Sequence, residues 1–276
     1  MSDRFRSRLL EARRVNKPLI AVHRGTSSGM VQENTSAAVK AAVMSGADIV
    51  EIDVLRSKDG DYFTFHDGYE ACRLNRPDSL KHLSSSEIRD RWYQQYGSYE
   101  LGRVETVQSV LADNREIFIN IDRSERYWCD GFLDDLAQWG DPEMMILKSN
   151  PSAESIHHLI QAASAFPYIG IVRTGEDLEA GLSRSDDVNL VGFEILAADS
   201  ESELLDPNLL SELRRSGFAI WFNAINLEDN RALCAGMDDE TSIFVSPDAG
   251  WGKLRDLGAD IIQTDWPWLL ERYLSE

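Results

Sequence analysis

Two histidines, an arginine and a group of carboxylates are the residues of this 276-residue chain best suited to chemistry. The string His23-Arg24 follows an apolar run, the acids Glu51 and Asp53 come next, and His66 lies shortly after them. Histidine exchanges protons near neutral pH, arginine binds phosphate with paired donors, and carboxylates hold hard divalent cations. These residue types together predict a metal-assisted phosphate ester site.

Glu51 and Asp53 are two residues apart in an apolar stretch, so both side chains point to one face of a strand. Asp122 ends the third predicted strand and would complete an oxygen cage for Mg²⁺ or Ca²⁺. An isolated pair with this spacing is often only a solvated strand face. Here the neighbouring residues are apolar and unpaired charge is costly to bury, so we favour a metal site.

The other polar residues also have structural alternatives. A histidine at a strand end is often structural, and an exposed arginine such as Arg24 is often only a solvated charge. The string Glu33-Asn34-Thr35 is typical of a helix start, where Asn34 or Thr35 would accept a hydrogen bond from a first-turn amide. We keep Glu33 as a candidate for a second role near the site.

Strand-like and helix-like segments alternate along the chain. Eight apolar segments are predicted strands, at 19–23, 48–53, 117–122, 145–148, 169–173, 190–195, 219–223 and 260–264. Helices are expected between them, at 35–45, 106–114, 129–139, 153–165, 176–184, 208–216 and 228–235. Strands separated by helices pair in parallel, and eight such units close a (β/α)₈ barrel. We expect 1–276 to form a single barrel domain of this kind.

Three segments depart from the repeating unit. Residues 62–66 follow the second strand after a turn too short for a parallel crossover, which predicts a β-hairpin that carries His66 over the barrel mouth. Residues 68–103 are expected to form a lid-like excursion before the third helix, with local helix around 85–91. The arginine-rich segment 1–17 is expected to be a short N-terminal helix.

Polar residues gather at the carboxyl ends of the predicted strands, the end at which barrel active sites form. They are His23, Glu51, Asp53, Asp122, Lys148, Arg173, Glu194, Asn223 and Asp265. The barrel topology therefore predicts that these side chains converge on one mouth.

Composition limits the partners. The formal net charge of −19 disfavours nucleic acid and anionic lipid headgroups, so we expect a small-molecule partner and no stable membrane association. The three cysteines, Cys72, Cys129 and Cys234, are odd in number and far apart, as is typical of reduced thiols. No signal peptide or membrane span is visible, which predicts a cytoplasmic protein. The oligomeric state is left open.

The order of the motifs resembles the glycerophosphodiester phosphodiesterase family, in its short bacterial form. The motifs are His23-Arg24-Gly25, Glu33-Asn34-Thr35, Glu51-Ile52-Asp53-Val54, Ser57-Lys58-Asp59-Gly60, His66-Asp67 and a closing Gly258-Ala259-Asp260 followed by Gln263-Thr264-Asp265-Trp266-Pro267. The similarity is dense over 18–67 and 254–270 and weaker between them. The resemblance implies a (β/α)₈ barrel of lipid metabolism that hydrolyses glycerophosphodiesters to glycerol 3-phosphate and an alcohol.

The resemblance also implies roles for individual residues. It makes His23 and His66 catalytic and Arg24 a phosphate ligand. It makes Glu51, Asp53 and Asp122 the ligands of one divalent metal, Mg²⁺ or Ca²⁺, with Mn²⁺ as a further candidate. In that scheme one histidine deprotonates the glycerol hydroxyl beside the phosphate, the other protonates the leaving alkoxide, and water opens the resulting cyclic phosphate.

Weaker matches extend the candidate site. Trp221 and Asn223 resemble the family's seventh-strand pattern and are candidate substrate-binding residues, and Glu33 and Asp67 are candidates for supporting positions behind the site. The family's third strand ends in a glutamate followed two residues later by a lysine, whereas Asp122 is followed there by Ser124. Lys148, at the end of the next strand, is the candidate for the missing cation.

The missing lysine leaves other functions open. One is a hydrolase for a sugar or inositol phosphodiester, in which aromatic residues of the excursion would stack on a sugar ring. These are Tyr69, Trp92, Tyr93, Tyr96 and Tyr99. The others are a lyase that stops at the cyclic phosphate and a weakened barrel that only binds a phosphorylated metabolite.

Overall fold

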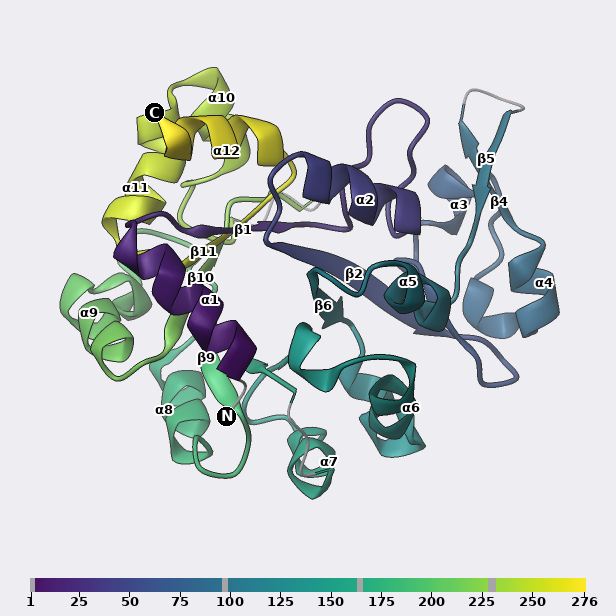
Figure 1. Cartoon of the computed structure of the whole chain (residues 1–276), viewed down its shortest axis with the longest axis horizontal. Coiled ribbons are helices and arrows are strands. Elements are labelled where there is room, and N and C mark those ends of the chain that lie inside the picture. Colours follow the sequence, from purple (N-terminus) through teal and green to yellow (C-terminus); the bar gives the residue numbers. More distant parts are fainter. Residues whose placement is uncertain (1–2, 96–98, 163–165, 228–231) are drawn as a thin grey trace.

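The computed structural model describes residues 3–95, 99–162, 166–227 and 232–276. Eight parallel strands form a closed barrel surrounded by helices (Figure 1). The strands are β1 Leu19–Val22, β2 Ile49–Arg56, β6 Phe118–Asp122, β7 Met145–Ser149, β8 Tyr168–Val172, β9 Leu190–Ile195, β10 Ala219–Asn223 and β11 Ile261–Thr264. β1 closes the barrel by pairing with both β2 and β11. This confirms the predicted (β/α)₈ fold.

The outer helices follow the strands in sequence. They are α2 Ser36–Met44, α5 Val107–Asp113, α6 Phe132–Trp139, α7 Ile156–Gln161, α8 Gly175–Ser183, α9 Pro207–Arg215, α10 Asp239–Phe244, α11 Trp251–Asp256 and α12 Pro267–Ser275. Several begin at a side chain that accepts a hydrogen bond from a first-turn amide, among them Thr35, Thr106 and Thr174. Their apolar faces pack on the outward-facing residues of the strands, which form the larger part of the core.

Three predicted helices differ from the structure. α7 begins at Ile156 rather than at the predicted residue 153. α6 begins at Phe132 rather than at Cys129, because Gly131 takes a left-handed φ of 83° after the 3₁₀ turn Glu125–Asp130. The helix expected over 228–235 is wrong for its described residues, 232–235, where Cys234 pairs with Ala197 in a parallel bridge. Residues 228–231 lie outside the described part of the chain.

The predicted hairpin is confirmed. β3 Tyr62–Thr64 runs antiparallel to β2, with Val54 opposite Thr64. The excursion that follows contains α3 Glu70–Arg73, a 3₁₀ turn at Leu80–His82, α4 Ser85–Arg89, and the two-stranded sheet of β4 Trp92–Gln95 and β5 Tyr99–Arg103. It stands to one side of the barrel beside β2 (Figure 1) and has a small core of its own, which includes Leu55, Phe63 and Ile88.

The basic N-terminal segment forms α1 Asp3–Arg14, as predicted. Phe5, Leu9 and Ala12 pack against the first residues of the barrel strands, opposite to the carboxyl ends that carry the predicted site. Arg13 pairs at 2.8 Å with the buried Asp260 before β11. None of the described helices is both long enough and apolar enough to cross a lipid bilayer.

Candidate active site at the carboxyl ends of the strands

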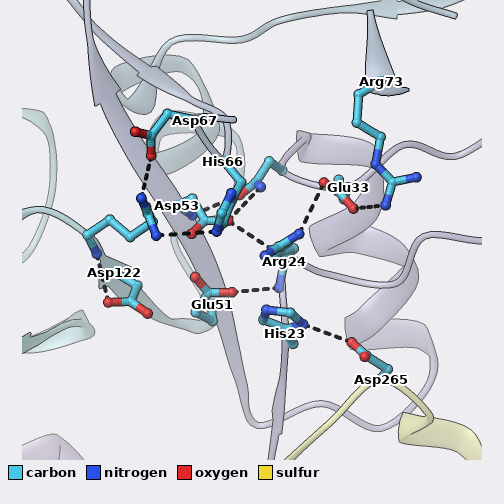
Figure 2. Close-up of polar contacts among 12 residues, drawn as sticks. His23, Arg24, Glu33, Glu51, Asp53, His66, Asp67, Arg73, Asp122 and Asp265 are labelled. Atoms are coloured by element: carbon cyan, nitrogen blue, oxygen red, sulfur yellow. Dashed lines mark hydrogen bonds and ion pairs between the residues drawn. The ribbon is translucent and has the colours of Figure 1, made fainter. Parts of the chain in front are cut away.

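His23 follows β1, and Asp265 follows the neighbouring strand β11. The Nδ1 atom of His23 lies 3.0 Å from Oδ1 of Asp265 (Figure 2). Burial alone would lower the pKa of His23, but Asp265 and then Glu51 outweigh burial and raise this pKa to about 9. His23 is therefore held as an imidazolium at neutral pH.

Asp265 is fixed in turn by a buried carboxylate that the sequence analysis missed. Asp239, the first residue of α10, accepts hydrogen bonds from the backbone N–H of Asp265 at 2.8 Å, Oγ1 of Thr264 at 2.8 Å and Nε1 of Trp251 at 2.7 Å. Its partners come from α11 and the end of β11. No short motif contains this arrangement, so sequence spacing carried no signal for it.

The three predicted metal ligands point inward from adjacent strands. Asp53 and Asp122 are register partners on β2 and β6. The buried Glu51 accepts a hydrogen bond from the backbone N–H of Arg24 at 2.7 Å. Burial, and then the charge of Asp53, raises the pKa of Glu51 to about 8. Burial also raises the pKa of Asp122 to about 6, against the effect of Lys148. A positive charge among these carboxylates would relieve their repulsion.

The donor chemistry of this group fits a hard cation. Oε1 of Glu51 and both polar side-chain atoms of Asn120, its register partner, are buried and have no hydrogen-bond partner in the described part of the chain. Oxygen donors of this kind suit Mg²⁺ or Ca²⁺. As the side chains stand, no three His, Cys, Asp or Glu residues of the described ranges are grouped closely enough to hold a metal ion. Binding would therefore require the carboxylates to close in on the cation.

Asn34 holds Asp53 in place, a role that the sequence analysis did not assign. Its Nδ2 donates to Oδ2 of Asp53 at 3.0 Å, and its Oδ1 accepts from the backbone N–H of Asp53 at 2.8 Å. Its backbone is left-handed, with φ of 58°. The helix cap predicted for Asn34 or Thr35 belongs to Thr35, whose Oγ1 accepts from the backbone N–H of Ala38 at 3.1 Å.

Arg24 lies among carboxylates beside this group. Its Nε is 3.0 Å from Asp53, and its NH1 is 3.4 Å from Glu33, which also pairs with Arg73 at 2.6 Å (Figure 2). The guanidinium lies over the ring of Tyr69, 4.7 Å from its centroid. Glu33 therefore lies behind Arg24, between two arginines, and its supporting role stays a prediction.

His66 follows β3 and lies against the same ring, with centroids 4.3 Å apart. Its Nε2 is 3.3 Å from NH1 of Arg123, whose NH2 pairs with Asp67. Asp67 also pairs with Lys81. Burial, and then the charges of Arg24 and Arg123, lower the pKa of His66 to about 4. His66 is therefore held neutral at neutral pH, whereas His23 is held protonated.

A cavity of about 1050 Å³ opens at these residues. Its lining includes His23, Arg24, Asp53, His66, Asp122 and Asn223. Apolar residues from β8 to β10 and the loops after them form much of the remaining wall, among them Ile171, Leu196, Ile225 and Leu233. The predicted convergence on one mouth is confirmed for these polar residues.

Lys148 and Trp221 do not line this cavity, so their predicted contact with substrate needs correction. The Lys148 side chain is 1% exposed, pairs with Glu194 at 2.9 Å, and places Nζ 3.3 Å from the ring centroid of Trp221. Nε1 of Trp221 donates to Oδ1 of Asn223 at 3.1 Å. Both side chains point into the filled barrel interior, where they support Asn223 from within the core.

The aromatic residues of the excursion are mostly directed elsewhere. Of those with described side chains, only Tyr69 lines the cavity. Tyr93 is fully buried in the core of the excursion, and Trp92 lies against Arg103. Tyr96 and the side chain of Tyr99 lie outside the described structure. The part of the excursion that the structure describes thus contributes one aromatic ring, that of Tyr69, to the cavity wall.

Known proteins resemble this chain in sequence and in fold. A protein family described as a domain of unknown function matches residues 168–274. A curated glycerophosphodiester phosphodiesterase from Caldanaerobacter subterraneus subsp. tengcongensis is 33% identical over 110 residues, 38% of this chain and 45% of the relative. The chain thus matches about half of that relative's length.

Solved structures match over almost the whole chain. A glycerophosphodiester phosphodiesterase from Thermotoga maritima has a TM-score of 0.66 at 21% identity and covers 93% of this chain and 98% of its own. An Oleispira antarctica phosphodiesterase in complex with the product sn-glycerol-3-phosphate has a TM-score of 0.65 at 18% identity and covers 94% and 97%. They share the barrel fold, and the curated match confirms the resemblance that the motifs indicated.

Proposed function

We propose that this chain is a metal-dependent glycerophosphodiester phosphodiesterase, which releases sn-glycerol 3-phosphate and an alcohol. The observation that carries the proposal is one cavity lined by two histidines, Arg24 and the carboxylates Asp53 and Asp122. The named relative and the product that is bound in the Oleispira antarctica structure support the choice of substrate.

The surroundings of the two histidines shift their pKa values in opposite directions, and this difference suggests their roles. His66, neutral next to Arg123, is the candidate base that takes the proton of the glycerol hydroxyl beside the phosphate. His23, held protonated by Asp265, is the candidate acid that donates a proton to the leaving alkoxide. Two groups whose pKa values are pushed apart are typical of an acid and base pair.

Glu51, Asp53 and Asp122 would hold one divalent cation. When bound, the cation would neutralise charge on the non-bridging phosphate oxygens. Arg24 reaches the same region and would add paired donors once phosphate competes with its carboxylate partners. Asn34 keeps Asp53 oriented, and Asp265 keeps the His23 ring oriented.

The test is phosphorus NMR of the products formed from glycerophosphocholine and glycerophosphoethanolamine, with Mg²⁺, Mn²⁺ or Ca²⁺ and with a chelator. We expect glycerol 3-phosphate only when the cation is present. Full turnover by demetallated protein would refute the metal site. A cyclic phosphate as the end product would instead identify a lyase. Turnover of sugar or inositol phosphodiesters alone would show that these, and not glycerophosphodiesters, are the substrates.

Variants separate catalysis from folding. His23→Ala and His66→Ala should each lower kcat by roughly 10²- to 10⁴-fold at unchanged melting temperature. His157→Ala is the matched control, because His157 is exposed on α7. Glu51→Gln should weaken cation affinity and leave the fold intact. Normal kcat in either histidine variant would exclude that residue from the reaction.

A further inference from the structure

The Arg123 side chain is the feature of the cavity that the assigned roles leave unexplained. Arg123 follows β6 with a left-handed φ of 57° and lines the cavity between His66 and Asp122. A residue other than glycine adopts this conformation only when its surroundings hold it there. Here the backbone N–H of Arg123 donates to Oδ1 of Asp122 at 2.7 Å, which fixes the turn.

Within the described ranges Arg123 forms an ion pair with one carboxylate, Asp67, while Asp53 and Asp122 act on it at longer range. Asp67, its carboxylate partner, also pairs with Lys81, so two cations share one carboxylate. Arg24 differs, since it pairs with both Asp53 and Glu33. An incoming phosphate would therefore meet less competition at Arg123 than at Arg24.

Two guanidinium donors of Arg123 lack a strong acceptor. Nε is buried with no hydrogen-bond partner within the described ranges. NH1 points at Nε2 of His66, 3.3 Å away, and this uncharged acceptor is weaker than a phosphate oxygen. Because arginine can only donate, the contact requires Nε2 of His66 to be unprotonated.

We propose that Arg123 is a phosphate-binding cation of this site in addition to Arg24, and that it moves one donor from Nε2 of His66 to a non-bridging phosphate oxygen when substrate binds. The proposal rests on the proposed function and adds a specific residue to it. The exchange frees Nε2 of His66 only when a phosphate is present, so the base becomes available together with its substrate. The ion pair between NH2 of Arg123 and Asp67 keeps the guanidinium close to the phosphate position before and after the exchange.

Arg123 also accounts for the absence of a lysine at position 124, where the resembling family has one and this chain has Ser124. Lys148 cannot serve without leaving Glu194, because its amine is buried below the cavity. Ser124 is buried too, and its hydroxyl donates to the backbone oxygen of Ile121 at 3.0 Å. The cation is therefore supplied one residue earlier in the chain.

The experiment measures binding of inorganic phosphate by calorimetry, for the wild type and for Arg123→Met, Arg123→Lys and Arg126→Met. Arg126 is the matched control because it is exposed and lines the same cavity. We expect Arg123→Met to weaken binding at least tenfold, Arg123→Lys to restore part of it, and Arg126→Met to stay within twofold. Phosphate affinity of Arg123→Met within twofold of the wild type overturns the proposal.

A second measurement is independent of how well the variant folds. In the wild type, phosphate should shift the imidazole ¹⁵N resonance of His66 Nε2 as the Arg123 donor leaves; an unmoved resonance at saturating phosphate overturns the exchange. A different result would refute the proposed function without refuting the phosphate site. Wild-type protein that binds phosphate through Arg123 but hydrolyses no glycerophosphodiester refutes the substrate assignment and leaves the phosphate site standing.

Discussion

Replacing Asp265 by asparagine should remove the charge that keeps His23 protonated. Asp265 contacts Nδ1 of His23 at 3.0 Å, and its charge is the largest factor that raises the pKa of this histidine to about 9. Asparagine can keep a hydrogen bond but carries no charge. Burial alone lowers the pKa of a histidine, so the pKa of His23 in Asp265→Asn should fall to its ordinary value of 6.5 or below.

The sign of the effect on stability follows from linkage. The folded-state pKa of His23 lies above the unfolded value, so its contribution is fully present below pH 6.5 and is lost as the pH rises through 9. The shift from 6.5 to about 9 corresponds to about 3 kcal/mol at 1.36 kcal/mol per unit. The side chain of Asp265 is 47% exposed, and solvent screening makes this an upper limit. We expect about 1 to 3 kcal/mol.

The assay is urea unfolding between pH 6 and pH 10 in the presence of a chelator, for the wild type and Asp265→Asn. Both proteins keep Glu51 and the other titrating groups, so the difference between their unfolding free energies isolates His23 to first order. This difference should shrink by about 1 to 3 kcal/mol from pH 6 to pH 10. NMR titration of the His23 ring checks the pKa directly. A His23 pKa near 6.5 in the wild type, or a difference that does not depend on pH, would refute the reasoning.

Three further predictions concern buried polar contacts. Lys148→Met leaves Glu194 buried without its partner and should cost about 3 to 5 kcal/mol in unfolding free energy, with part restored by adding Glu194→Gln; denaturation that is unchanged would contradict this. Asp260→Asn loses the charge that pairs with two arginines at the end of the barrel opposite the cavity, so the melting temperature should fall while kcat per folded molecule stays unchanged; loss of kcat would show coupling between the two ends. Asn34→Ala frees the Asp53 carboxylate and should weaken Mg²⁺ affinity about tenfold or more in a metal titration, and wild-type affinity would exclude the orienting role.

The strand positions could be predicted because each barrel strand is short, apolar and β-branched. All eight predicted strands correspond to observed ones, with ends that agree to within one residue, except that β2 continues three residues further than predicted, to Arg56. Parallel pairing then fixed which ends meet, and so the inward-pointing acids and histidines could be expected at one mouth. Thr35 shows the limit of local reasoning. The sequence indicated a cap at Asn34 or Thr35, and only the folded chain shows that Thr35 caps α2 while Asn34 binds Asp53.

By itself, then, the sequence determined the barrel, the hairpin that carries His66 and the set of residues at the mouth, because these follow from local periodicity and strand order. Tertiary structure decided how charges are shared among residues distant in the chain. It placed Lys148 in the filled interior with Glu194, and it brought Arg123 to His66 across 57 positions of sequence. It also put Asp239 behind Asp265. Pairing of this kind depends on which side chains the packed barrel brings within hydrogen-bond distance, and no spacing along the sequence encodes it.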